Sequence, residues 1–520
     1  MSFPGYNDSV LSLLIFGPLL AAALAMFLRS DNLLRGWTLV STSALAVFSL
    51  PLYWRFDPST ADFQFEVNLP WIPVLKIHYA LGIDGISLLL VLLTTLIMPL
   101  CVLASWRYIT TRVKEFMICL LIMESAMVGV FCALDFILFF VFWEAMLIPM
   151  ALLIGIWGGP RKVYAALKFF IYTMAGSVFL LVAIIALFIK VGSFSIPEIM
   201  GHSPSFSLNF QRWIFLAFFI SFAIKVPMFP FHTWLPDAHV EAPTAGSVVL
   251  ASVLLKMGTY GFIRFSLPLL PEASIHQTIV RVLIVLSLIG ILYGALVSLM
   301  QKDWKKLVAY SSVSHLGFCT LGIFALNPNG LAGSVLQQVN HGISTGMLFL
   351  VIGVIYERRH TREISEYGGL AHVMPVFATV FAIAMLSSAG LPLLNGFIGE
   401  FTILQGAFEA NRVWAAFAVL GIIFGAAYQL WLYQRTMLGQ VTNAKNLGLP
   451  DLSLRELAVF VPLIAWAFWI GVYPKPYFDI LEKPVQQIVE RVRPDYYQGK
   501  APAVARSPLL PAAASVSNHE

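Results

Sequence analysis

Long apolar runs separated by short polar loops dominate the chain, and runs of about 18–25 apolar residues are long enough to cross a bilayer as helices. The pattern therefore predicts an all-α polytopic membrane protein with about 14 transmembrane helices. One run, 374–409, is too long for a straight helix, so we expect two half-helices around the stretch 390–396. The predicted spans are 10–28, 33–53, 83–105, 115–133, 135–157, 166–190, 212–235, 244–267, 276–299, 307–325, 331–356, 374–409, 413–437 and 453–473.

The seventh run contains a lysine followed closely by two prolines, Lys225, Pro227 and Pro230. A lysine at mid-bilayer costs about 2.5–3.5 kcal/mol on insertion scales, so it is expected to face protein or water. Each proline removes a backbone donor and clashes with the carbonyl four residues back. A helix breaks at membrane depth only where it is buried in protein or lines a wet cavity. Lys225 therefore predicts an ion path, and the alternative is a structural lysine that reaches the interface from a kinked helix.

The break after Lys225 has a counterpart 165 residues later, where Gly390, Pro392 and Asn395 follow the same spacing. This correspondence predicts two five-helix repeats, spans 4–8 and 9–13, with spans 7 and 12 broken. An odd number of spans in each unit makes the second repeat inverted in the membrane, as in many transporters. The predicted division is 1–110 for the N-terminal helices, 111–270 and 271–440 for the repeats, and 441–520 for the last span and a flexible tail, which we expect to be disordered from about Gln498.

Composition and charge agree with a chain that is almost entirely membrane domain. It has 520 residues, of which 59% are hydrophobic and 11% charged, whereas soluble proteins have about 25% charged residues. Lys and Arg concentrate in the loops after odd-numbered spans, although the loop after span 7 is acidic and the C-terminal tail is basic. By the positive-inside rule these loops are cytoplasmic, and both termini are predicted to be periplasmic in a bacterial inner membrane.

The sequence predicts no cofactor or metal site in this chain. The four cysteines lie in apolar runs without a CxxC pair or a nearby His cluster, and no Gly-rich phosphate loop is present. The first span lacks a basic segment before it, so we expect a retained helix and not a cleaved signal.

One ionisable side chain lies in the middle of each of six predicted spans. Pairing favours the charged forms of a buried acid and a buried lysine, and separation favours their neutral forms. Histidine titrates near neutral pH and suits relay steps. Such a set can pass protons through side chains and trapped water, although an inert ion pair and packing histidines remain alternatives. The six residues are Glu144, Lys225, Lys256, His315, His341 and Glu400.

His341 is a secondary relay candidate, and three further residues are secondary candidates as well. His232 and His239 flank the cytoplasmic end of span 7 and are candidates for an uptake path. Lys168 lies near the start of span 6, where it is either a relay group or a lysine that orients the span. Asp84 and Asp135 lie at span edges, and helix capping is the simplest explanation for both.

Taken together, these segments resemble the antiporter-like membrane subunits of respiratory complex I, the NADH–quinone oxidoreductase, and their relatives among multisubunit cation/proton antiporters. The resemblance covers about positions 80–440. The segments are FWEAMLIP (142–149), KVPMFPFHTWLPDAHVEAP (225–243), LKMGTYG (255–261), DWKKLVAYSSVSH (303–315) and GLPLLNGFIGEF (390–401). Within the family, the GIDGIS stretch at 82–87 and an acid at Glu400, where other branches usually have lysine, are most similar to the M-type subunits.

The resemblance implies fourteen helices, two inverted repeats and a proton channel along a central polar axis. It implies that Glu144 and Lys225 form the coupling pair, that Lys256 and His315 form the central relay, and that Glu400 is the exit-side group. The expected function is proton translocation driven by electron transfer from NADH to quinone elsewhere in the complex. FMN, iron–sulfur clusters and quinone would belong to partner subunits, and neighbouring antiporter-like subunits would be partners. A sodium/proton antiporter subunit and a purely structural spacer are the alternatives; no nucleic acid is expected.

Overall fold

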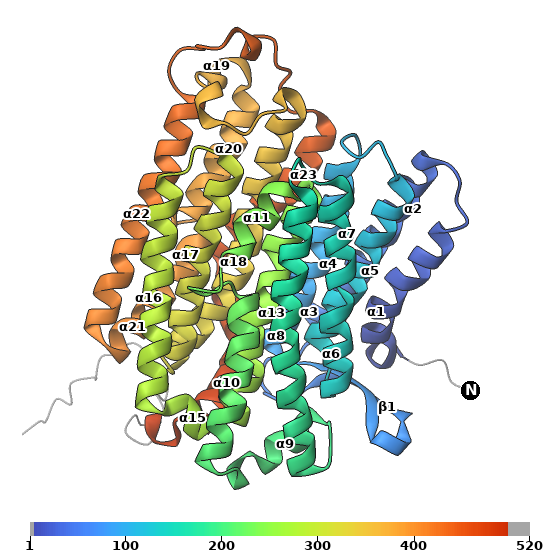
Figure 1. The fold of residues 1–520 in the computed structure, drawn as a ribbon, viewed down its shortest axis with the longest axis vertical. Coiled ribbons are helices and arrows are strands. Elements are labelled where there is room, and N and C mark those ends of the chain that lie inside the picture. The colour runs from blue at the N-terminus through green and yellow to red at the C-terminus, as the bar shows by residue number, and fades with distance from the viewer. Residues whose placement is uncertain (1–4, 498–520) are drawn as a thin grey trace, which may run out of the picture.

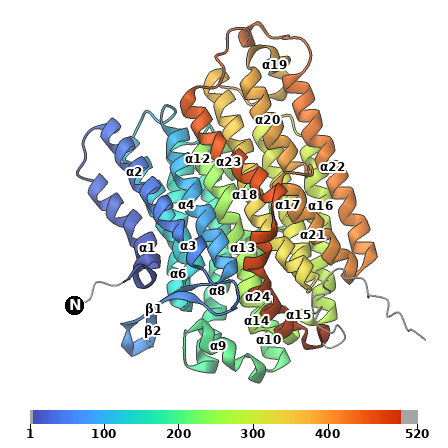
Figure 2. The same cartoon turned by 180° about the vertical axis from the view of Figure 1, so that it is seen from behind.

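The structure is a computed structural model that describes residues 5–497. Its helices stand side by side in an elongated bundle, with α1 and α2 at one edge and α16 and α22 at the other (Figures 1 and 2). Within the described residues, thirteen helical stretches are long and apolar enough to cross a membrane. The predicted all-α class is therefore confirmed. The spans made of one helix are α1 (Tyr6–Ala25), α4 (Gly85–Ser105), α5 (Val113–Cys132), α8 (Lys162–Val191), α16 (Gln277–Leu299), α17 (Trp304–Phe324), α18 (Pro328–Arg359), α22 (Arg412–Met437) and α23 (Leu454–Val472).

Both predicted helix breaks are present. Span 7 consists of α10 (Leu208–Lys225) and α11 (Trp234–Glu241), and span 12 consists of α20 (Pro375–Ser388) and α21 (Asn395–Ala410). The second span divides into α2 (Asp31–Ser49) and α3 (Pro51–Arg55).

Span 5 has a break that the sequence analysis did not predict, between α6 (Phe136–Ala145) and α7 (Leu147–Trp157). Pro149 accounts for it, because its missing N–H leaves the Ala145 carbonyl without the usual helical donor.

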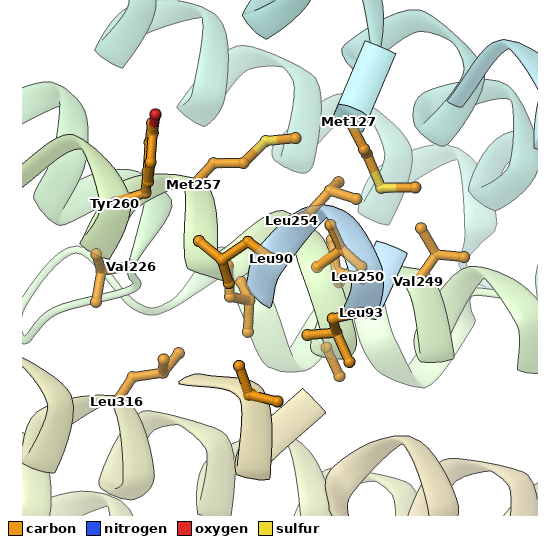
Figure 3. Packing of buried hydrophobic residues seen from close by; sticks show 14 of the residues in the cluster. Leu90, Leu93, Met127, Val226, Val249, Leu250, Leu254, Met257, Tyr260 and Leu316 are labelled. Atoms are coloured by element: carbon orange, nitrogen blue, oxygen red, sulfur yellow. The ribbon is translucent and has the colours of Figure 1, made fainter. Parts of the chain in front are cut away.

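Span 8 is interrupted in another way. Its order is α12 (Thr244–Val249), η3 (Leu250–Leu254), α13 (Leu255–Gly261), η4 (Phe262–Ser266) and α14 (Leu267–Leu269), in which η3 and η4 are π-helical. Such wider turns occur frequently at functional sites. One side of this span packs on apolar residues of α4 and α5, as Figure 3 shows for Leu254 and Met257 beside Leu90 and Met127.

Several elements outside the predicted spans gather at the end of the bundle opposite α19 (Leu370–Val373) (Figures 1 and 2). The strands form an antiparallel hairpin, and α24 packs against α4 and α18. The sequence analysis predicted only a last span and a flexible tail for 441–520, and the tail expected to be disordered from Gln498 lies outside the described residues. These elements are β1 (Gln64–Ile72), β2 (Ile77–Ile83), α9 (Ile196–His202), α15 (Pro271–Ile275) and α24 (Lys475–Val492). Short 3-10 turns are η1 (Pro73–Leu75), η2 (Ser203–Ser205), η5 (Ile364–Glu366), η6 (Ala444–Asn446) and η7 (Pro494–Tyr496).

The crossing of α10 and α13 requires a glycine at 258. A Cβ atom on Gly258 would lie 2.7 Å from Val226 Cγ2 and 2.9 Å from the Phe222 carbonyl oxygen. The two backbones therefore approach at the point where α10 ends, next to Lys225.

We predict that Gly258→Ala destabilises the protein by about 1–3 kcal/mol, because the added methyl group overpacks this crossing. Gly425→Ala is the control, because a Cβ atom at Gly425 meets nothing within 4 Å. The measurement is the thermal midpoint of the detergent-solubilised complex. Equal midpoints for the two variants would show that the crossing has room for the methyl group.

Candidate proton-transfer site

Lys256 lies at the centre of the bundle, completely buried on α13 between the two π-helical segments. Its Nζ donates to the Ala251 carbonyl of η3 and lies 2.7 Å from Nδ1 of His341 on α18. The sequence analysis treated His341 as a secondary group. In the structure it is the direct partner of Lys256.

His315 on α17 connects this pair to Glu400 on α21. The ring centroids of His315 and His341 are 5.7 Å apart, and Nδ1 of His315 lies 2.8 Å from Oε1 of Glu400. Gln337 donates to the same carboxylate oxygen at 3.0 Å. Lys256, His341, His315 and Glu400 therefore form a chain of adjacent buried groups, which we call the central chain.

The break in span 12 holds Glu400 in position. The Asn395 side chain accepts a hydrogen bond from the Ser387 hydroxyl at 2.6 Å and donates to the Asn340 carbonyl at 3.2 Å. Asn340 in turn donates to the Asn395 carbonyl at 2.7 Å. The buried amides thus join the two half-helices to α18. The sequence analysis assigned them no role, although amides inside an apolar run were the available signal.

Glu144 and Lys225, the expected coupling pair, are neighbours that make no direct contact. The buried Lys225 Nζ lies 3.6 Å from Sδ of Met146 and 4.9 Å from the ring centroid of Trp143. Among the described residues no salt bridge joins the two, and the buried Oε1 of Glu144 has no hydrogen-bond partner. The aromatic face stabilises the ammonium in place of the carboxylate.

The end of α10 next to Lys225 is stabilised by the second half of its own span. Trp234 on α11 donates its indole N–H to the Ile224 carbonyl at 2.9 Å. This bond supplies a donor to a carbonyl that the break leaves exposed at the helix end.

Lys225 is separate from the hydrogen-bonded groups of the central chain. No hydrogen bond of the described residues connects Lys225 with Lys256. Figure 3 shows Val226, Met257 and Leu316, the apolar sequence neighbours of Lys225, Lys256 and His315, within the buried hydrophobic packing. The structure therefore brings the predicted axis together as two clusters and not as one continuous row.

The secondary candidates differ in their surroundings. His232 lies beside the rings of Phe229 and Tyr293, with its Nδ1 unpartnered. His239 on α11 is completely buried, and neither of its ring nitrogens has a partner. Lys168 forms a partly exposed salt bridge with Asp237 at 2.7 Å. Such pairs contribute about 0–1 kcal/mol, and this position favours the interpretation of Lys168 as an orienting lysine.

Some buried charges inside spans escaped the sequence analysis. Glu124 on α5 is completely buried, and both of its carboxylate oxygens lack a hydrogen-bond partner. Arg264 of η4 pairs with Asp84 at 2.5 Å. The predicted caps are confirmed, because Asp84 and Asp135 each accept two backbone N–H bonds at the starts of α4 and α6. Among residues 5–497, no group of three or more His, Cys, Asp or Glu is placed to hold a metal.

Comparison with known families identifies this arrangement. Residues 133–425 match the family described as NADH:quinone oxidoreductase/Mrp antiporter, and residues 13–130 match the amino-terminal region of NADH-ubiquinone oxidoreductase chain 4. The chain belongs to this family. Its resemblance to the antiporter-like subunits is thereby confirmed, and its relatives are of the M type.

The relatives cover nearly the whole chain. NADH-quinone oxidoreductase subunit M of Rhodobacter capsulatus is 47% identical over 94% of this chain and 98% of its own length. NADH-ubiquinone oxidoreductase chain 4 of Marchantia polymorpha is 44% identical, with the same coverage. A chain of respiratory complex I from Thermus thermophilus with bound NADH is 32% identical with TM-score 0.86, covering 93% of this chain and 99% of that one.

A chain of the Mrp complex from Dietzia is similar in fold alone. It is 21% identical with TM-score 0.77, and the match covers 96% of this chain and 57% of that one.

We predict that Asn395→Leu destabilises the break in span 12. The substitution removes the hydrogen bonds that join the Asn395 side chain to the Ser387 hydroxyl, the Ser344 hydroxyl and the Asn340 carbonyl, at a net cost of about 0.5–1.5 kcal/mol for each bond. Thr402→Val on the same helix is the control, because the Thr402 hydroxyl bonds only the Ile398 carbonyl of its own helix. Thermal inactivation of the purified complex measures the difference. If the two variants lose stability equally, the amide network does not hold the break.

Proposed function

We propose that this chain is the proton-translocating membrane subunit of an NADH–quinone oxidoreductase, in which it moves protons through buried Glu, Lys and His groups. The observation that carries the proposal is the central chain. Four protonatable side chains from four spans lie next to one another, with direct contacts of 2.7 Å at one end and 2.8 Å at the other. The M-type relatives, at 42–47% identity over most of the chain, support the same conclusion.

The geometry of the central chain suits stepwise proton transfer. A protonated Lys256 can donate to Nδ1 of His341, and Glu400 can exchange a proton with Nδ1 of His315. The two histidines offer their remaining ring nitrogens, and Nε2 of His341 has no partner. An imidazole accepts a proton on one nitrogen and releases one from the other, so its own protonation state is unchanged after each transfer.

Glu144 and Lys225 provide the coupling in this proposal. While Lys225 lies over Trp143, its charge is not neutralised by Glu144. Movement of the ammonium onto the carboxylate would pair the two charges. Opposite charges interact strongly at low dielectric, so such a movement changes the protonation of neighbouring groups.

The remaining parts of the proposal concern the assembly. The chain acts as a translocase subunit without a redox centre of its own, while FMN, iron–sulfur clusters and quinone lie in partner subunits. Its partners are other membrane-arm subunits, including neighbouring antiporter-like ones. The loops at the α19 end face the bacterial cytoplasm, and both termini face the periplasm. The three N-terminal spans and two inverted repeats, divided at about 110, 270 and 440, form its domains.

We predict that Glu144→Gln, Lys225→Met and Glu400→Gln each lower NADH-driven proton pumping by about tenfold or more, because each removes one proton-transfer or coupling group. Glu198→Gln is the control, because Glu198 is exposed on α9 outside the spans. Pumping is measured as acidification of inverted membrane vesicles, normalised to the amount of assembled complex. Near-normal pumping in all three variants would reject the proposal and favour a structural spacer.

The sodium/proton antiporter alternative predicts a different ion dependence. We expect acidification of the vesicles to be unchanged when sodium is replaced by choline, because the proposed path consists of proton-exchanging groups. The measurement compares initial rates in the two salts at equal ionic strength. A rate that rises with sodium concentration would favour the antiporter function.

A further inference from the structure

A buried lysine that the proposed function does not use lies at the end of the bundle nearest α19. Lys305 is in the first turn of α17, and 7% of it is exposed. Its Nζ donates to the carbonyl of Ala242, the residue that follows α11, at 2.5 Å. The side chain therefore points into the protein, toward the second half of the broken span 7.

A small cavity lies beside Lys305. It is about 20 Å³ in volume, and Tyr108, Glu241, Lys305, Tyr356 and Arg362 are among the residues that line it. A space of this size holds about one water molecule, provided that polar groups surround it. Lys305, Glu241 and Arg362 supply such groups. Burial raises the pKa of Tyr108, so its hydroxyl keeps its proton at neutral pH.

The charged groups that face Lys305 come from three elements. Glu241 is at the end of α11, Asp303 caps α17, and Arg362 follows α18. Glu241 lies near Arg161, with 4.0 Å between Oε1 and Nε, and Arg362 bonds Asp303 at 3.1 Å. Both acids thus already have an arginine partner, and the hydrogen bond of Lys305 goes to a neutral carbonyl.

Polar atoms without partners lie between Lys305 and the central chain. His239 interacts electrostatically with both Lys305 and Lys256, and its two ring nitrogens are unpartnered. The Thr345 hydroxyl and Nε2 of His341 are also buried and unpartnered. Buried polar atoms are nearly always hydrogen-bonded to protein or water, so such a group of exceptions requires an explanation.

These groups lie along one face of α18. His341, Thr345 and Phe349 are spaced four residues apart, so they lie above one another on the helix. His239 stacks on Phe349 with ring centroids 4.5 Å apart. Tyr356, two turns farther on, lines the Lys305 cavity. At 1.5 Å per residue, this face covers about 22 Å from His341 to Tyr356.

We propose that Lys305 is the proton-uptake group of this subunit, and that protons pass from it through His239 and Thr345, with intervening water, to His341 and Lys256. This inference rests on the proposed function. The ammonium of Lys305 passes its proton by way of water to His239 and becomes a neutral amine. A proton that enters from the cytoplasmic side through the cavity water then restores the ammonium, so no charge accumulates. The purely structural alternative is that Lys305 only caps the end of α11, where a cation stabilises the last carbonyls.

Substitutions at Lys305 separate the two roles. Lys305→Arg keeps the positive charge and the hydrogen-bond donor but does not release a proton. Lys305→Met removes the charge, the donor and the transferable proton. We expect both variants to pump about tenfold more slowly in assembled complex, because each lacks a transferable proton. Lys306→Met is the matched control, because Lys306 is the adjacent, more exposed lysine of the same turn. Normal pumping in either Lys305→Arg or Lys305→Met would overturn the proposal.

A titratable replacement and a neighbouring substitution extend the test. Lys305→His should restore part of the pumping with a pH optimum shifted toward the acid side, because the ordinary pKa of histidine is about 6.5. A cap alone predicts no such shift. Thr345→Val removes one hydroxyl and leaves the Ala242 carbonyl untouched, so it tests the route even if the Lys305 variants fail to assemble. Unchanged pumping in Thr345→Val would overturn the route.

The result is distinguishable from failure of the proposed function. If Glu144→Gln and Glu400→Gln abolish pumping while the Lys305 and Thr345 variants pump normally, only the uptake route is wrong. If Glu144→Gln and Glu400→Gln also pump normally, the proposed function is wrong.

Discussion

A charge buried among apolar helices must find its partner inside the protein, and the centre of this bundle is arranged around that requirement. Each group of the central chain comes from a different span and lies next to the following group in the chain. An unpaired charge in such surroundings costs several kcal/mol or more, so it changes its protonation state instead. The same requirement that stabilises the central chain therefore makes its members ready to exchange protons.

The helix breaks are the second device. A broken span ends with unpaired carbonyls and N–H groups that must be satisfied at membrane depth. At the first break the Trp234 indole serves this purpose, and at the second the Asn340 and Asn395 amides do. The two breaks differ in the position of their charged residue. Lys225 ends the first half of span 7, whereas Glu400 lies in the second half of span 12. The π-helical turns of span 8 perform a related task, because the carbonyl of Ala251 in η3 accepts from Lys256.

The separation into two clusters has a mechanistic consequence. Lys225 and its neighbour Glu144 form one cluster and the central chain forms the other, and no hydrogen bond of the described residues joins Lys225 to Lys256. Under the proposed function, Lys225 would therefore act on the central chain through its electric field or through water that enters in another state. Tyr356, farther along α18 than His341, lines the cavity beside Lys305. The two proposals thus assign the supply of protons to Lys256 and the control of Lys256 to different residues.

The sequence by itself determined the order of the spans, both Pro-associated breaks and the identity of the four groups of the central chain. These features depend on local properties: the length of an apolar run, the missing N–H of proline and the cost of a charge in lipid. The tertiary structure decided which groups touch. The pattern of apolar runs contains no information on how a helix is rotated toward its neighbours. It therefore did not show that His341 contacts Lys256. Nor did it show that Lys225 lies over Trp143 and makes no direct contact with Glu144. The β1–β2 hairpin and α24 were not predicted either. Both lie against the bundle end, and neither contains a long apolar run.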